Sequence, residues 1–268
     1  MGISRDRGSS MSSSGEGLLV EQPQALASPG VHEKVLELVA RLPARTVLDA
    51  PAGHGALTVQ LLEMGKIVTA GDIDIEKFQV NPDQPGLQLV QLNLIAPQLP
   101  FPEHTYDLAI CIEGIEHLEN QWQLIRNLNR VLKPGGFLII STPNIINFKS
   151  RVRFFTEARY EFFKRPMVLG KSIDHDLDTY HIAPISYFEF QFILESCGFA
   201  IDELHANIYS SRNILSVILR PLFRAFYRYK CYRDKKRNRG DFAELYETIM
   251  TDELYFGETL IVIARKKG

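Results

Sequence analysis

Two glutamates and a histidine stand within five residues of one another in the segment Glu113-Gly114-Ile115-Glu116-His117. Histidine is the usual general base near neutral pH, because its unperturbed pKa is about 6.5. Two carboxylates and an imidazole are also a donor set that holds hard divalent cations. The segment is therefore a candidate for catalytic chemistry, with Glu113, Glu116 and His117 as its reactive groups. A core or capping role for His117 stays open as the alternative.

This segment follows a run, Asp107 to Ile112, that is continuously apolar after its first residue. Such a run is typical of a strand buried on both faces of a sheet. The other predicted strands are Thr46 to Ala50, Lys66 to Ala70, Leu87 to Leu92, Phe137 to Ser141, Ala200 to His205 and Thr259 to Ala264. Helical patterns lie between most of them, so the chain is predicted to be an α/β protein with a doubly wound, mostly parallel sheet.

A glycine-containing turn joins the first predicted strand to a helix in VLDAPAGHGALTVQ, residues 47–60. A dinucleotide fingerprint, G-x-G-x-x-G, needs a third glycine beside the pyrophosphate, and none follows Gly53 and Gly55 here. Asp72 ends the second strand, 19 residues after Gly53, where a carboxylate would accept both hydroxyls of a ribose. A ligand that has a ribose but no phosphate in need of a glycine-rich binding turn suggests S-adenosylmethionine.

Together these segments resemble the class I S-adenosylmethionine-dependent methyltransferases, in particular the ubiquinone-biosynthesis O-methyltransferase-like group of types 11 and 23. The matching stretches, in the family's order, are VLDAPAGHG, TAGDID, LVQLNLIAPQLPF, YDLAICIEGIEHLEN, RVLKPGGFLIISTPN and the late ESCGF. They span roughly residues 31–206, with a last strand in ETLIVIARKK. The resemblance implies a seven-stranded Rossmann-like sheet with an antiparallel last strand, and a methyltransferase that uses S-adenosyl-L-methionine as its cofactor.

The resemblance also implies a set of cofactor-binding residues. Gly53 and Gly55 would let the backbone pass beneath the methionyl part of the cofactor, Asp49 would face its ammonium group, and Asp72 would hold the ribose. The full set is Asp49, Ala50, Pro51, Ala52, Gly53, His54, Gly55, Asp72, Ile73, Asn93, Leu94, Ile112 and Gly114. Two departures from the family are Pro51-Ala52, where Gly-Cys or Gly-Ser is commoner, and Asn93, where many members have Asp. An amide oxygen still accepts a bond from the adenine amino group.

Methyl transfer from a sulfonium is an in-line displacement, for which the protein supplies alignment and, where needed, a base. Glu-x-x-Glu-His resembles the metal-binding segment of the ubiquinone-biosynthesis O-methyltransferases and of the small-RNA 2′-O-methyltransferases. A later histidine completes the site in the RNA enzymes, and His181 takes a similar place here. We favour a catalytic His117 with Glu113 and Glu116. A divalent metal on Glu113, Glu116, His117 and His181 is the less favoured interpretation.

Composition and pattern suggest the domain organisation of the 268 residues. Residues 1–27, rich in Ser and Gly, are predicted to be a disordered tail. Residues 28–206 and 256–268 form the predicted methyltransferase domain, within which 143–185 would cap the substrate side. Residues 207–255 are an insertion between the last two strands. The three cysteines share no metal or disulfide spacing, which favours a reduced compartment.

The insertion combines basic and aromatic residues at helical spacing. Arg220, Arg224 and Arg228 recur every four residues, and between them lie Leu222, Phe223, Phe226, Tyr227 and Tyr229. This pattern over 212–239 predicts an interfacial helix that lies on an anionic membrane surface with its aromatics in the headgroup region. A helix packed on its own sheet or on a second copy in a homodimer is the alternative. Nucleic acid is a less favoured partner, because no recognised RNA module is present.

These expectations combine into one functional hypothesis. The protein would O-methylate a small, glycan-linked or lipid-linked acceptor, and it would be cytoplasmic and peripheral at the inner membrane face. No apolar run approaches the roughly 20 residues that a membrane-spanning helix needs. A metal-dependent RNA 2′-O-methyltransferase and a non-catalytic cofactor-binding scaffold stay open as alternatives.

Overall fold

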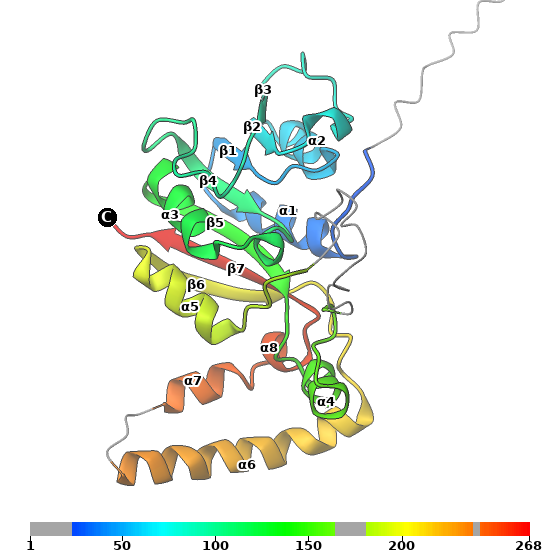
Figure 1. Ribbon diagram of the computed structural model, residues 1–268, viewed down its shortest axis with the longest axis vertical. Helices are drawn as coiled ribbons and strands as arrows, with labels where there is room; N and C mark the ends of the chain where they lie inside the picture. The colour runs from blue at the N-terminus through cyan, green and yellow to red at the C-terminus, as the bar shows by residue number, and fades with distance from the viewer. Residues whose placement is uncertain (1–22, 164–180, 238–241) are drawn as a thin grey trace, which may run out of the picture.

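The computed structural model describes residues 23–163, 181–237 and 242–268 and is built around one seven-stranded sheet (Figure 1). The strand order is β3-β2-β1-β4-β5-β7-β6. The strands are β1 (Thr46–Asp49), β2 (Ile67–Asp72), β3 (Leu87–Gln91), β4 (Tyr106–Cys111), β5 (Leu132–Pro143), β6 (Phe199–Ala206) and β7 (Thr259–Lys266). β7 runs antiparallel to β5 and β6, and the remaining pairs are parallel. The predicted Rossmann-like sheet with an antiparallel last strand is therefore confirmed.

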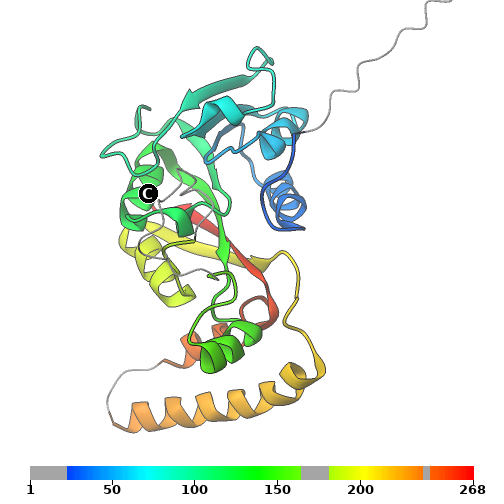
Figure 2. The same cartoon turned by 45° about the vertical axis from the view of Figure 1, so that its right-hand side comes forward.

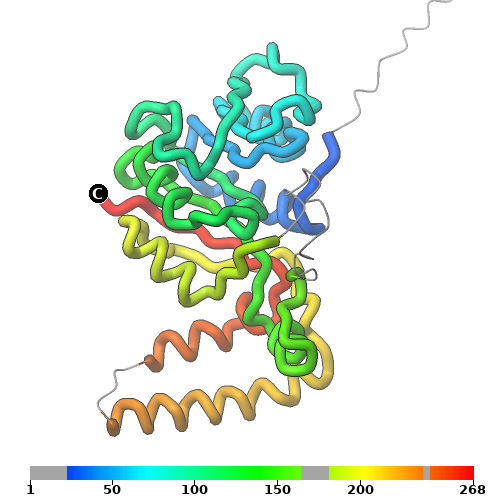
Figure 3. The backbone as a smooth tube through the Cα atoms, viewed as in Figure 1, coloured from blue at the N-terminus to red at the C-terminus, as the bar shows by residue number. Residues whose placement is uncertain are grey.

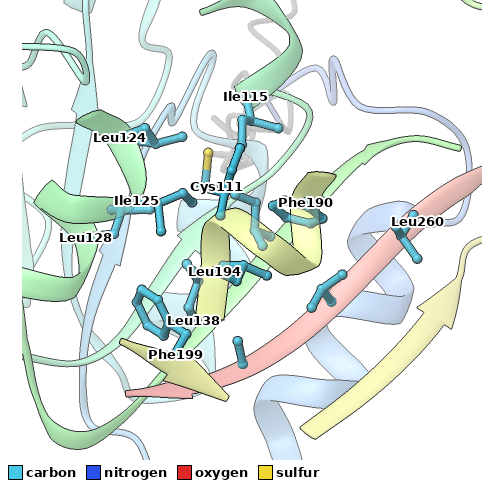
Figure 4. Packing of buried hydrophobic residues seen from close by; sticks show 14 of the residues in the cluster. Cys111, Ile115, Leu124, Ile125, Leu128, Leu138, Phe190, Leu194, Phe199 and Leu260 are labelled. Carbon is cyan, nitrogen blue, oxygen red and sulfur yellow. The ribbon is translucent and has the colours of Figure 1, made fainter. Parts of the chain in front are cut away.

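Helices cover both faces of this sheet. α1 (Val31–Arg41) and α2 (Ala56–Glu63) pack on one face, where Leu108 and Ile110 of β4 point. α3 (Gln121–Val131) and α5 (Tyr187–Ser196) pack on the other, where Ala109 and Cys111 point (Figure 4). Because successive side chains of a strand alternate between faces, a strand buried on both sides must be apolar throughout, as β4 is.

One strand boundary differs from the prediction. The strand was predicted to run from Phe137 to Ser141, but β5 already begins at Leu132. Leu132 pairs with Tyr106, and the register then shifts before Leu108 pairs with Phe137. An ion pair of 2.7 Å between Lys133 and Asp107 holds this irregular start against β4.

Four further helices gather at one end of the molecule (Figures 1 and 2). They are α4 (Phe148–Glu157), α6 (Ile214–Lys236), α7 (Ala243–Thr248) and α8 (Asp252–Phe256). α4 follows β5, α6 follows β6, and α7 and α8 return the chain to β7, as the tube in Figure 3 shows. Since β5 and β6 run parallel to β1 and β4, these helices lie at the carboxyl edge of the sheet, and α6 is the outermost of them.

Parts of the predicted domain organisation lie outside the described residues. These are residues 1–22 of the predicted tail, 164–180 of the predicted cap, and 238–241 of the insertion. Among the helices that the structure describes, none combines the length and the apolar composition needed to cross a bilayer.

Candidate active site

A cavity of about 670 Å³ opens at the carboxyl ends of β1, β2 and β4. This volume is in the range of small-molecule sites, and the edge is the one at which open α/β sheets bind ligands. The predicted cofactor residues that line the cavity are Asp49, Pro51, Ala52, Gly53, His54, Asp72, Ile73, Asn93, Leu94, Ile112 and Gly114. Ala50 and Gly55 do not line it.

Gly55 has a different reason for being glycine. It is the N-cap of α2 with φ of 89°, a left-handed conformation that favours glycine. A Cβ at this position would lie 2.6 Å from Val80 and 2.8 Å from Phe78. Gly55 therefore lets the loop after β2 pack on the turn. The expected approach of its backbone to the cofactor stays a prediction beside this packing role.

The Asp72 carboxylate closes the turn from the end of β2. One oxygen accepts a hydrogen bond of 2.8 Å from the Gly53 amide, and the other accepts one of 3.1 Å from the Asp74 amide. Each carboxylate oxygen has a second lone pair, so Asp72 still has acceptors for the hydroxyls of a ligand in the cavity. Asn93 keeps one acceptor in the same way, since its Oδ1 accepts a single bond of 3.0 Å from the Ile95 amide.

Asp49 is a buried acid at the base of the cavity, with 2% of its surface exposed. Burial raises its pKa to about 7, the nearby Asp72 adds to the rise, and a hydrogen bond of 2.6 Å from the Thr58 hydroxyl opposes it. A cationic group placed beside Asp49 would favour its ionised form. The site is therefore suited to a ligand that carries a ribose and an ammonium group, as S-adenosylmethionine does.

A second group of side chains also meets the cavity. Ligand atoms of Glu116, His117 and His181 all lie within 4.8 Å of one another. The two imidazole centroids are 4.8 Å apart, with the rings at 80°, and both rings line the cavity. The backbone carbonyl of Glu116 accepts hydrogen bonds of 3.0 Å from the amides of Ile182 and Ala183. These bonds bring His181 next to a histidine 64 positions earlier in the chain.

The donor atoms of this cluster suit a divalent cation. Glu116 is fully buried, and neither of its carboxylate oxygens makes a hydrogen bond of standard geometry to a described residue, although the nearby Thr142 hydroxyl acts to lower its pKa. Burial, reinforced by the charge of Glu113, raises the pKa of Glu116 to about 8. Burial and then the adjacent His117 lower the pKa of His181 to about 4. A neutral imidazole beside a carboxyl group with unused acceptors is a donor set that fits a divalent metal ion.

Glu113, which the sequence analysis grouped with these residues, lies apart from them. Its carboxylate accepts hydrogen bonds from the Ser28 amide at 2.8 Å and from the Thr259 hydroxyl at 3.1 Å. Its amide donates to the Ser141 hydroxyl at 3.0 Å, and its φ of 44° is unusual for a residue other than glycine. Glu113 thus joins the end of β4 to the N-terminal segment and to β7; it lines the cavity, but it is not one of the three residues whose ligand atoms cluster.

Among the lining residues that were not predicted from the sequence, four precede β1: Gln24, Leu26, Ala27 and His32. The first three belong to the stretch expected to be part of a disordered tail. Leu26 lies over the glycine turn, where a Cβ on Gly53 would come within 3.2 Å of its side chain. His32 opens α1, and burial lowers its pKa. The only sequence signal for these residues was their position just before the first amphipathic helix.

The chain is similar to known methyltransferases in sequence and in structure. Residues 48–140 match the family described as "Methyltransferase domain". A probable S-adenosylmethionine-dependent methyltransferase of Mycolicibacterium smegmatis is 28% identical over 174 residues, which are 64% of this chain and 59% of that protein. The ubiquinone biosynthesis O-methyltransferase of Coxiella burnetii is 30% identical over 144 residues, which are 53% of this chain and 61% of that enzyme. The chain thus spans about three fifths of the length of these two relatives.

Solved structures support the fold alone. An S-adenosylmethionine-dependent methyltransferase from Archaeoglobus fulgidus superposes with a TM-score of 0.52 at 18% identity, covering 88% of this chain and 93% of that one. A putative methyltransferase of Haloferax volcanii, solved with its Trm112 activator, gives 0.54 at 18% identity, covering 89% and 90%.

The sheet order and the glycine turn with its two acids define the class I methyltransferase fold and cofactor site. Residues 48–140 are a methyltransferase domain by this match, and the chain is similar to class I S-adenosylmethionine-dependent methyltransferases. S-adenosylmethionine is its cofactor.

Proposed function

We propose that the protein transfers a methyl group to an oxygen atom of its acceptor, a hydroxyl or carboxyl group of a small, glycan-linked or lipid-linked molecule. The observation that carries this proposal is that His117 and His181 line the same cavity as Asp49 and Asp72. A proton acceptor thus shares the cavity with the cofactor residues. The similarity to an enzyme named for ubiquinone biosynthesis O-methylation supports oxygen as the acceptor atom.

In this mechanism S-adenosylmethionine, when bound, supplies an electrophilic methyl group. Asp72 would hold the ribose through its remaining acceptor positions, and Asp49 would stabilise the ammonium group. His117 would take the proton from the acceptor hydroxyl at a ring nitrogen as the oxygen attacks. The cavity walls orient the two reactants for in-line displacement, which is the main source of rate in such a transfer.

A divalent metal ion on Glu116, His117 and His181 is our second proposal for the same site. From the sequence alone, a metal at this site was the less favoured interpretation. The buried carboxylate oxygens of Glu116, which no hydrogen bond of standard geometry satisfies among the described residues, support it, because an acid in this environment is stabilised by a cation. A metal there would lower the pKa of an acceptor hydroxyl. Glu113 is not part of this donor set.

The acceptor is tested by turnover. We expect purified protein to convert S-adenosylmethionine to S-adenosylhomocysteine when it is given a lipid or glycolipid extract. Turnover with RNA alone would favour the 2′-O-methyltransferase alternative. If neither the lipid or glycolipid extract nor RNA supports turnover while the cofactor still binds tightly, the scaffold alternative is favoured and the proposal is contradicted.

Asp72→Ala is expected to weaken S-adenosylmethionine binding by roughly tenfold to a hundredfold, since a charge-assisted contact worth about 1.5–3 kcal/mol is lost. Calorimetry measures the affinity directly. Asp83→Ala is the matched control, because Asp83 is an exposed acid that follows the same strand and does not line the cavity. Equal affinities of Asp72→Ala and wild type would refute the ribose assignment.

Exhaustive chelation is expected to abolish activity if the metal proposal is right, and a single divalent cation should restore it. Glu116→Gln should then raise the cation concentration for half-maximal activity by at least about tenfold. Glu119→Gln is the control, since Glu119 is exposed and only three positions further on. Activity that survives chelation unchanged would leave Glu116 and His181 without a role as catalytic ligands.

A further inference from the structure

α6 is a long helix that uses only one of its faces for packing. Ser216 and Asp234 are buried on this inner face. Phe223 meets the Tyr255 ring of α8 at 6.3 Å, and Tyr227 stacks on Tyr246 of α7 at 5.0 Å. Arg220 also turns inward, to an ion pair of 2.5 Å with Asp252. The prediction that Phe223, Tyr227 and Arg220 face a membrane is therefore wrong, because α7 and α8 cover that side of α6.

The opposite face of α6 carries a continuous row of apolar and aromatic side chains, which we call the outer stripe. Its members are Ile214, Ile218, Leu222, Phe226, Tyr229 and Tyr232, each at least 57% exposed. They recur at steps of three and four residues, which keeps them on one side of a helix. A row of this size is unusual for a surface that faces only water and marks an interaction site.

The charges beside the outer stripe are positive. α6 contains seven Lys or Arg residues, and its one acid, Asp234, is buried. Arg224, Arg228 and Lys235 are exposed and, at about 100° of rotation per residue, fall within about 40° of one another along one side of the stripe. The whole chain has a formal charge of −2, so this positive band is a local feature.

We propose that the outer stripe docks the protein on an anionic lipid bilayer, with α6 lying in the plane of the headgroups. An apolar row with tyrosines in it and cations along its side is the pattern of a helix that binds this interface. The exposed cations then meet acidic headgroups while the apolar side chains enter the acyl boundary.

Two other occupants fit the observations less well. A second copy paired through the same stripe by a twofold axis would bring Arg224 and Arg228 of both chains together, with no exposed acid of α6 to offset them. Nucleic acid would need cations at the centre of the contact, where α6 instead presents Leu222 and Phe226.

The docking surface lies at the same edge of the sheet as the cavity. α6 follows the carboxyl end of β6, and the cavity opens at the carboxyl ends of β1, β2 and β4, which run parallel to β6. Docking would therefore bring the edge that holds the cavity towards the bilayer, which suits a lipid-linked acceptor. The docking proposal itself does not rest on the proposed function.

Vesicle flotation with the full chain tests the proposal. We expect the wild type to float at low salt with vesicles of equal parts phosphatidylcholine and phosphatidylglycerol, to lose this binding as salt rises, and to stay in solution with phosphatidylcholine alone. Leu222→Ser with Phe226→Ser should weaken partitioning about tenfold to a hundredfold. Arg228→Glu with Lys235→Glu should weaken it at least about 30-fold.

Phe192→Ser is the matched control. Phe192 is a 65% exposed aromatic on α5, beside Trp122 of α3, and is not on α6. This variant should float like the wild type. Every variant is checked for thermal melting and for S-adenosylmethionine affinity. The melting temperature should be unchanged because the substituted side chains are exposed, and the affinity should be unchanged because the cavity lies on other elements. A loss of flotation with intact cofactor binding separates the docking surface from the methyltransferase site.

Four results would overturn the proposal. The first is wild-type protein that stays in solution with the acidic vesicles at low salt, and the second is outer-stripe variants that float as well as the wild type. The third is a dimer in light scattering that Leu222→Ser with Phe226→Ser converts to a monomer. The fourth is binding of the protein to RNA but not to vesicles. The third would make the stripe an interface between copies, and the fourth would make α6 a nucleic-acid contact.

Discussion

His117→Ala is expected to lower turnover about 10²–10⁴-fold, while S-adenosylmethionine affinity stays close to that of the wild type. His117 lines the cavity next to His181, and neither histidine is among the residues assigned to the cofactor. Removing its ring takes away a proton acceptor, or a metal ligand, without touching the residues assigned to the cofactor. The loss should therefore appear in kcat and not in cofactor binding.

Steady-state kinetics and calorimetry on the same preparation make this measurement. His205→Ala is the control, since His205 lies on β6, paired with Glu203 at 2.7 Å, and does not line the cavity. His117→Gln separates the two roles, because an amide cannot act as a base at neutral pH. A kcat for His117→Ala within a few-fold of the wild type would remove His117 from the mechanism.

Asp49→Asn is expected to change the pH dependence of stability. The pKa of Asp49 is about 7 in the folded protein, against 3.8 for an unperturbed Asp. Between these values the unfolded chain loses its proton and the folded chain keeps it, so the wild-type free energy of unfolding falls as pH rises. Asn carries no proton to lose, so the stability of the variant relative to the wild type should rise by about 2–3 kcal/mol between pH 5 and pH 8.

The buried side-chain amide that Asp49→Asn introduces would add an unsatisfied donor, which costs about 1–2 kcal/mol at every pH. The variant should therefore be close to the wild type in stability at pH 5 and more stable than the wild type at pH 8. Denaturant melts at both pH values provide the test. A difference between variant and wild type that does not change with pH would mean that Asp49 is not held protonated in the fold.

Asp49→Asn should also weaken cofactor binding, because the proposed partner of the ammonium group loses its charge. For the wild type, we expect affinity to fall by up to about tenfold for each pH unit below 7, as the ionised fraction of Asp49 declines. The variant should bind more weakly and show no such slope. A wild-type affinity that is flat between pH 7 and pH 5.5 would contradict the role of Asp49.

The sequence by itself determined the sheet and the cofactor end of the cavity. Gly53 and Asp72 lie on either side of one helix, and parallel strands place their carboxyl ends at one edge. Local patterns therefore suffice to bring these two residues together. The same reasoning placed Glu116 and His117 at that edge, since they follow β4 directly.

Only the tertiary structure decided the rest, because it depends on contacts between distant segments. His181 reaches His117 through backbone bonds from 182 and 183 to the carbonyl of Glu116, and Glu113 turns away because Ser28 and Thr259 supply its donors. Helical spacing predicted two faces for α6 but not which one is buried. The buried face is the one on which Tyr246 packs against Tyr227 and Tyr255 packs against Phe223. The outer stripe on the opposite face stays exposed.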